Sequence, residues 1–468
     1  MNFADLQVWD GILHFASLAL LLLFANVLRR KTPFLKRSLL PTAVIAGFIG
    51  LFLKETLFTP IFGEAQYDAT LSVLRVFTYH AIALGFIALG LKTGVALKIR
   101  AKNNKSMFSG LLIVSTYLIQ GLIALSLTIF MAYTIFPGLF KASGMLFPMG
   151  FGQGPGQANN IGNIYEFDYG FVGGSSFGLA IASFGFLWAS VAGVIYLNWL
   201  YKNNRIEKAD VQKTKRVSNQ EIETPDEIPV AEAIDKFTVQ IALVLTVYLF
   251  TFGIIYGVVL LMNTGILGAF GVQTIASLVV GFNFIIGMLL AMAFKHLFLW
   301  LRKVNIMTRQ YPNNYMLNRI AGTFFDFMIV SAIAGIRVED LSGLWIPFIS
   351  VSFIVGMVTL FYIIFMTKRI YPEYPVQASL GMFGMLTGTA STGIVLLREA
   401  DPNFETPVAN DLVVGSSTAI LFGFPILLLV GIAPESTLAT FITLGIIIVL
   451  TAIVVSILLK LNPSIRKD

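Results

Sequence analysis

The chain of 468 residues contains no cysteine and only three histidines, His14, His80 and His296. The absence of cysteine excludes disulfide bonds, thiolate metal sites and cysteine nucleophiles. Because the histidines are far apart in the sequence, a histidine-rich metal site is not expected. Charge is also scarce: 12% of the residues are charged, whereas soluble domains have roughly 25%. The composition therefore argues against a soluble domain.

Apolar residues are abundant where charged residues are scarce. They make up 56% of the chain and occur in blocks of about 18 residues or more, which is long enough to cross a bilayer as a helix. The sequence predicts an all-α polytopic membrane protein with about eleven transmembrane helices. We expect the spans at residues 9–28, 38–57, 72–92, 107–136, 172–200, 237–261, 268–297, 317–337, 343–367, 407–433 and 437–460.

Basic residues gather in alternate loops between these spans, as the positive-inside rule requires. Arg29, Arg30 and Lys31 follow the first span, so we expect the N-terminus outside the cell. Lys460, Arg466 and Lys467 follow the last span and predict a cytoplasmic C-terminus. The net charge of +7 is explained by these loops, and no nucleic-acid partner is predicted. The pattern favours a multi-pass protein of the cytoplasmic membrane.

Residues 201–236 are polar, basic in their first part and acidic in their second. This segment is predicted to be a cytoplasmic linker between two halves, residues 1–200 and 237–433. Residues 434–468 would then be an extra C-terminal transmembrane helix and a cytoplasmic tail.

Two segments do not fit the pattern of simple spans. They lie near residues 145–168 and 378–401, and both are rich in glycine and small polar residues. The predicted topology leaves the two ends of each segment on one side of the membrane. Non-helical backbone at membrane depth occurs only where protein or water satisfies its polar groups. Each segment is therefore predicted to be a re-entrant hairpin.

The two halves share several short patterns in the same order. "GQANNIGNIYEFD" (156–168) matches "GTASTGIVLLREAD" (388–401), and "VGGSSF" (172–177) matches "VVGSST" (413–418). By the charge rule the matched spans run in opposite directions. This order predicts an inverted-topology repeat, which is typical of secondary transporters that bind substrate near the bilayer midplane.

A glycine-rich break in a membrane helix frees backbone N–H and C=O groups to bind a ligand. Helix N-termini at the break favour an anion, and free carbonyls can hold a cation. Amide and hydroxyl side chains at both segments add neutral donors and acceptors. The candidate substrate- and ion-binding residues are Gly152, Gln153, Gly154, Gly156, Gln157, Asn159, Asn160, Thr387, Gly388, Thr389, Ser391 and Thr392.

Asp326 is also a candidate, because it lies near the middle of the span at 317–337. An acid there costs about +2.5–3.5 kcal/mol on insertion scales, so it is usually functional. It could take part in ion coupling or line the substrate path, or it could make a structural hydrogen bond to another span. Lys92 and Arg337 close two matched spans, and each could extend to the lipid headgroups or face a substrate carboxylate.

At the two hairpins the chain resembles the sodium/glutamate symporter family. The resemblance is carried by "GQGPGQA" (152–158) and "FGMLTGTASTG" (383–393), and by the span ends "GLK" (90–92) and "GIR" (335–337). In the first motif, Gln153 and Pro155 stand where the family often has histidine and threonine.

The resemblance implies sodium-coupled symport of glutamate or a similar small carboxylate by an elevator-type secondary transporter that forms a homodimer. Sodium would be the coupling ion, with no other cofactor, and membrane lipid would surround the protein. A sodium- or proton-coupled carrier of another carboxylate, such as citrate or a dicarboxylate, is the alternative. A channel is less favoured because the spans show little polar periodicity. No nucleophile or metal motif supports an enzyme.

Overall fold

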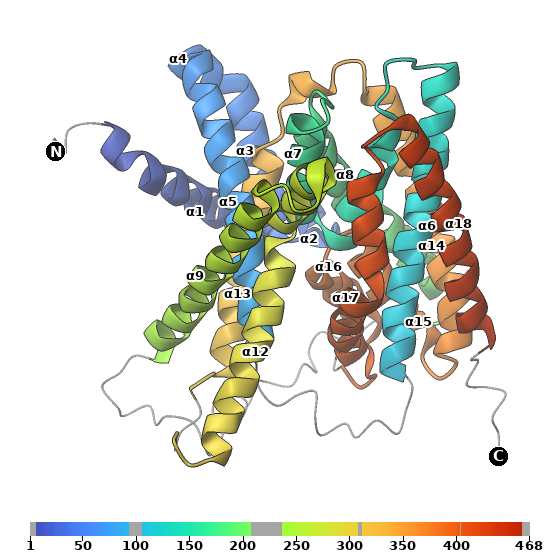
Figure 1. Ribbon diagram of the computed structural model, residues 1–468. Coiled ribbons are helices and arrows are strands. Elements are labelled where there is room, and N and C mark those ends of the chain that lie inside the picture. The colour runs from blue at the N-terminus through green and yellow to red at the C-terminus, as the bar shows by residue number, and fades with distance from the viewer. Residues whose placement is uncertain (1–5, 93–104, 207–235, 308–310, 403, 461–468) are drawn as a thin grey trace. The chain divides into compact units, whose positions relative to one another are not determined.

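The computed structural model describes residues 6–92, 105–206, 236–307, 311–402 and 404–460. Within these ranges every regular element is a helix (Figure 1). The part of the chain that is described contains nine helices long and apolar enough to cross a membrane. This confirms a polytopic membrane protein.

The chain divides into two compact units, and each unit contains segments from both halves of the sequence. Unit 1 comprises residues 1–76, 103–214 and 329–468, and unit 2 comprises residues 77–102 and 215–328. The boundaries fall inside helices α5 (Glu64–Gly90) and α13 (Asn314–Ala334). Most of the predicted linker, residues 207–235, lies outside the described residues.

Unit 1 is built around α6, which packs against α14, α17 and α18 (Figure 1). Long apolar sequences without interior charge explain why these four helices form. The other elements of this unit begin near the N-terminus with α1, α2, α3, η1 and α4, and continue through the two broken segments. Their bounds are α1 (Leu6–Lys31), α2 (Pro33–Arg37), α3 (Thr42–Leu53), η1 (Lys54–Phe58), α4 (Thr59–Phe62), α6 (Lys105–Thr134), η2 (Lys141–Met145), η3 (Pro148–Gln153), α7 (Pro155–Phe167), α8 (Gly174–Lys202), η7 (Val338–Leu341), α14 (Trp345–Ile370), α15 (Pro375–Thr387), α16 (Ala390–Ala400), α17 (Val408–Ile432) and α18 (Thr437–Lys460).

Unit 2 has a core of aliphatic side chains from the end of α5 and from three other helices, with Ile87, Val244, Ala291 and Ile320 among its buried members. Beside this core, the Tyr79 hydroxyl donates to the Val280 carbonyl over 3.0 Å. The remaining helices of the unit are α9 (Lys236–Asn263), α10 (Gly268–Phe270), η6 (Gly271–Ala276), α11 (Ser277–Gly281) and α12 (Asn283–Lys303).

Two predicted spans are not single α-helices. The span expected at 38–57 is α3 followed without a gap by the π-helical η1 and by α4, so this segment is helical but not a regular α-helix throughout. Lys54, the first residue of η1, is buried and donates to the Tyr67 hydroxyl over 3.1 Å. π-Helical turns are rare in α-helices and are often found at functional sites. The span expected at 268–297 is likewise interrupted, at Phe282 between α11 and α12.

The order of elements recurs in the two halves. A long helix, two short helical segments separated by a break, and another long helix follow one another as α6, η3–α7, α8 and again as α14, α15–α16, α17. This order places the two predicted hairpin sequences at equivalent positions. The inverted orientation of the halves stays a prediction.

Candidate functional site

The first broken segment consists of η3 and α7, which are separated at Gly154. Gly154 has φ +92°, a conformation that costs a residue with a side chain much more than glycine. Pro155 follows as the first residue of α7, where proline is favoured because that N–H has no helical partner. The glycine and the proline together end one helix and start the next. We call residues 152–156 the first tip.

The second broken segment consists of α15 and α16, which pack closely against one another as a helical hairpin. A Cβ atom on Gly384 would lie 2.8 Å from the Gly393 Cα atom, so the two backbones are nearly in contact. The chain reverses between the helices at Gly388 and Thr389. We call residues 387–390 the second tip.

The two tips meet inside unit 1. A Cβ atom on Gly154 would lie 3.6 Å from the Gly388 carbonyl oxygen and 3.6 Å from the Thr389 Cγ2 atom. Both glycines are predicted binding residues from separate parts of the sequence, and the structure places them side by side. Two breaks that are more than 200 residues apart therefore form one polar region.

Helix ends of both signs are found at this meeting point. Helices α7 and α16 begin at the tips, whereas η3 and α15 end there. Helix N-termini carry partial positive charge and C-termini partial negative charge. Residues 148–165 and 375–397 contain no charged side chain. The region can therefore bind an anionic group and a cation through backbone and neutral side chains.

Gln157 stands out among the predicted binding residues. It lies in the first turn of α7 and is fully buried. In the described structure neither atom of its side-chain amide has a hydrogen-bond partner. Buried amides are normally paired, so an unpaired one indicates a role other than packing.

The other predicted residues differ in how they are used. Asn159 donates to the Arg75 carbonyl over 3.2 Å and accepts from the Ser175 hydroxyl over 3.2 Å, so its amide is engaged by the protein. The Thr387 hydroxyl donates to the Phe383 carbonyl of its own helix over 2.7 Å. The Thr389 and Thr392 hydroxyls are 3.4 Å apart. The first tip also includes Gly152, Gln153 and Gly156, and Asn160 is buried in α7, whereas Ser391 is exposed.

Two residues of α6 contact the tips and were not identified from the sequence. The Tyr117 hydroxyl donates to the Gly152 carbonyl over 3.0 Å. Gln120, one turn later, donates to the Leu386 carbonyl over 2.8 Å and to the Thr359 hydroxyl over 3.2 Å. A sequence signal did exist, because Gln120 is the only side-chain amide in α6.

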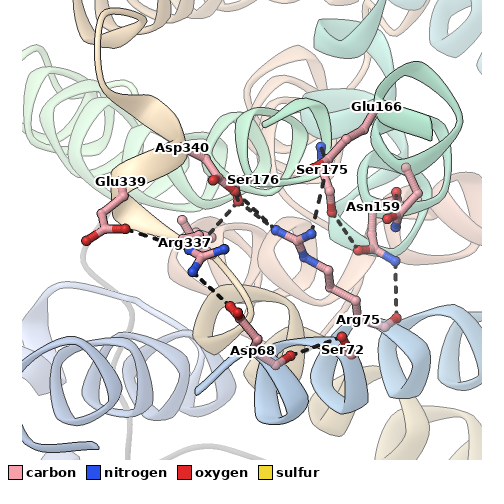
Figure 2. A network of polar contacts seen from close by, with 12 residues as sticks. Asp68, Ser72, Arg75, Asn159, Glu166, Ser175, Ser176, Arg337, Glu339 and Asp340 are labelled. Carbon is pink, nitrogen blue, oxygen red and sulfur yellow. Dashed lines mark hydrogen bonds and ion pairs between the residues drawn. The ribbon is translucent and has the colours of Figure 1, made fainter. Parts of the chain in front are cut away.

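A second polar region in unit 1 is charged. We call it the Arg75 cluster; it contains Asp68, Arg75, Glu166, Ser176, Arg337 and Asp340 (Figure 2). The Arg75 guanidinium donates to Ser176 over 2.8 Å and lies 3.4 Å from the Asp340 carboxylate and 3.9 Å from Glu166. Ser176 in turn donates to Asp340 over 2.6 Å. The cluster links α5 to α7, α8 and η7.

The Arg75 cluster also answers two questions left by the sequence. Arg337 lies 2.8 Å from Asp68, so its guanidinium forms an ion pair within the protein. Ser176 belongs to the Gly-Ser-Ser pattern at residues 174–176, which is repeated at 415–417. Its hydroxyl accepts a hydrogen bond from the backbone N–H of Arg337 over 3.1 Å. In the second pattern, Ser416 corresponds to Ser175. The Ser416 hydroxyl donates to the Leu412 carbonyl of its own helix over 2.7 Å and lies 3.5 Å from the Met385 sulfur, whereas the Ser175 hydroxyl donates to the Asn159 side chain over 3.2 Å. The hydroxyls of these two serines therefore have different partners.

Asp326 belongs to unit 2, and its side chain is exposed. The tips belong to unit 1. A part for Asp326 in ion coupling stays a prediction.

The chain was compared with known proteins. The family model for the sodium/glutamate symporter matches residues 9–397. This match covers most of the chain and includes both tips, while α17 and α18 lie beyond its end. No curated protein matched the chain. The extent of the family match shows that the chain belongs to the sodium/glutamate symporter family, which is a family of transporters and not of enzymes.

Proposed function

We propose that this protein is a sodium-coupled symporter of glutamate or a similar small carboxylate, and that the substrate binds where the two tips meet. The main support for this proposal is the short distance between the tips: a Cβ atom on Gly154 would lie 3.6 Å from the Gly388 carbonyl oxygen. Two membrane segments are therefore broken at the same place. Such breaks are where secondary transporters bind substrates and ions.

The distribution of polarity at the tips supports a carboxylate as substrate. The first turns of α7 and α16 direct backbone N–H groups to this region, and these favour an anion. The buried Gln157 amide adds a donor and an acceptor. The helix ends of α15 and η3 would favour the accompanying cation.

The repeated order of α6, η3–α7, α8 and α14, α15–α16, α17 supports two re-entrant hairpins in an inverted repeat. In the elevator mechanism that we propose, one group of helices would carry the tips across the membrane. The basic loops favour an N-terminus outside and a C-terminus inside the cytoplasmic membrane. A homodimer surrounded by lipid is the assembly we propose.

Transport by purified protein in liposomes tests this function directly. We expect radiolabelled L-glutamate to accumulate in the liposomes when there is an inward sodium gradient. Uptake should fall to background when choline replaces sodium. Competition by unlabelled citrate and dicarboxylates would measure the breadth of the site. Uptake that ignores sodium but follows a proton gradient would contradict sodium coupling. Failure to take up any of these carboxylates, in liposomes where a control carrier works, would contradict the proposed function.

A further inference from the structure

The side-chain amide of Gln120 has a fixed orientation. Gln120 is 1% exposed, and its Nε2 atom donates to the Leu386 carbonyl over 2.8 Å. Because a carbonyl oxygen can only accept a hydrogen bond, the NH₂ group must face Leu386 and the oxygen must face away. Among the described residues, no donor pairs with this Oε1 atom. The Gln120 atom that has no hydrogen-bond partner in the described chain is therefore an acceptor.

Gln120 Oε1 faces the first tip. It lies 3.2 Å from the position that a Cβ atom on Gly152 would occupy. On the other side of the same amide, Leu386 belongs to the last turn of α15, just before the second tip. One side chain therefore contacts the end of α15 that leads into the second tip, and its oxygen lies beside the first tip.

The surroundings of this oxygen favour positive charge. The C-terminal end of α15 carries partial negative charge, and the tips contain no acidic or basic side chain. A buried acceptor without a donor is unfavourable, and a cation or a charged N–H group relieves this cost. A carboxylate has no proton to offer and would be repelled.

We propose that Gln120 Oε1 binds a cationic group of the transported solutes beside the first tip. This inference rests on the proposed function. Two cationic groups have the required chemistry, the coupling sodium ion and the ammonium group of an amino-acid substrate. Gln120 is therefore a binding residue contributed by α6, outside both broken segments.

The test uses the full-length protein in detergent and the variant Gln120→Met, which removes the oxygen and keeps the side-chain length. Thr359→Val is the matched control, because it removes a partner of Nε2 and leaves Oε1 in place. The melting temperature is measured at increasing concentrations of sodium chloride, with choline chloride keeping the ionic strength constant. It is then measured at fixed sodium with increasing L-glutamate, and separately with increasing glutarate, which lacks the ammonium group.

If Oε1 binds sodium, Gln120→Met should need about tenfold more sodium for the same stabilisation, while Thr359→Val behaves like the wild type. If Oε1 binds the ammonium group, the sodium response should be unchanged. The concentration of glutamate needed should then rise about tenfold, with no change for glutarate. Either result supports the inference.

The inference alone would be overturned if the wild type responds to sodium and glutamate and Gln120→Met responds identically. It would also be overturned if Thr359→Val lost the responses as fully as Gln120→Met, because the role would then be packing. Gln120→Glu retains an acceptor and should keep the cation response, which covers the case in which Gln120→Met does not fold. A wild type that responds to neither solute would instead overturn the proposed function.

Discussion

The tips and the Arg75 cluster both hold polar groups inside unit 1, but they differ in charge and in pairing. In the Arg75 cluster, arginine, carboxylates and serine contact one another at 2.6–3.9 Å. At the tips there are no charged side chains, and Gln157 and the Gln120 oxygen have no hydrogen-bond partner in the described chain.

Pairing is informative because buried polar groups are expensive when they have no partner. The charged groups of the Arg75 cluster pair with one another and hold segments of the chain together, although the Nε atoms of Arg75 and Arg337 have no hydrogen-bond partner in the described chain. Groups that remain unmatched are retained at a cost in stability, and a ligand can offset that cost. We therefore expect mutations in the Arg75 cluster to affect stability and mutations at the tips to affect transport.

The largest effect is expected from Gly154→Val and Gly388→Val. At Gly154 the φ of +92° is unfavourable for valine, and at Gly388 a Cβ atom would lie 3.0 Å from the Thr392 hydroxyl. Both variants should abolish sodium-dependent uptake in liposomes while still inserting into the membrane. Gly445→Val, where no atom lies within 4 Å, is the control. Normal uptake by both tip variants would rule out the tips as the site.

The second-largest effect is expected from a variant that should weaken substrate binding without changing stability. Gln157→Leu should reduce uptake about tenfold or more without lowering the melting temperature, because the buried amide has no hydrogen-bond partner to lose. Gln240 is a matched control: it is also a buried glutamine, but it donates to the Tyr311 carbonyl and accepts from the Asn313 N–H. Gln240→Leu should cost about 1–3 kcal/mol of stability. Equal destabilisation of both variants would remove the distinction between the two regions.

Arg75→Met should lower stability by about 1–3 kcal/mol, because it leaves the largely buried Asp340 and Glu166 carboxylates without their cation. Arg337→Met is the comparison, since Arg337 is 32% exposed and its partner Asp68 is 58% exposed. That loss should be about 0–1 kcal/mol. Thermal melting in detergent measures both, and a larger loss for Arg337→Met would contradict this ranking.

The smallest effect compares a serine of the Arg75 cluster with one near the second broken segment. Ser176→Ala removes contacts with Arg75, Asp340 and the Arg337 backbone N–H and should cost about 1–2 kcal/mol. Ser416→Ala removes a bond to its own helix and a 3.5 Å contact with the Met385 sulfur, and it should cost less than about 0.5 kcal/mol. Melting curves of the two variants side by side measure this difference, and equal losses would contradict it.

The sequence located the helix breaks well and the contacts between distant segments poorly. Gly154, Pro155 and Gly388 act on the backbone next to them, so their effect can be predicted locally. Tyr117 and Gln120 lie in an apolar helix, and their partners are 35 and 266 residues away. The span at 38–57 was predicted as one helix because hydropathy does not reveal a π-turn at Lys54.

The sequence by itself determined that this protein crosses the membrane many times, that two segments are broken by glycine, and that disulfide bonds are excluded because the chain has no cysteine. Composition and local backbone preferences are enough for these conclusions, because they act over a few neighbouring residues. Only the tertiary structure decided that the tips meet, that α6 contacts both, and that Arg75 pairs with Asp340. Those contacts depend on how helices pack, and packing brings together residues whose separation along the chain carries no signal.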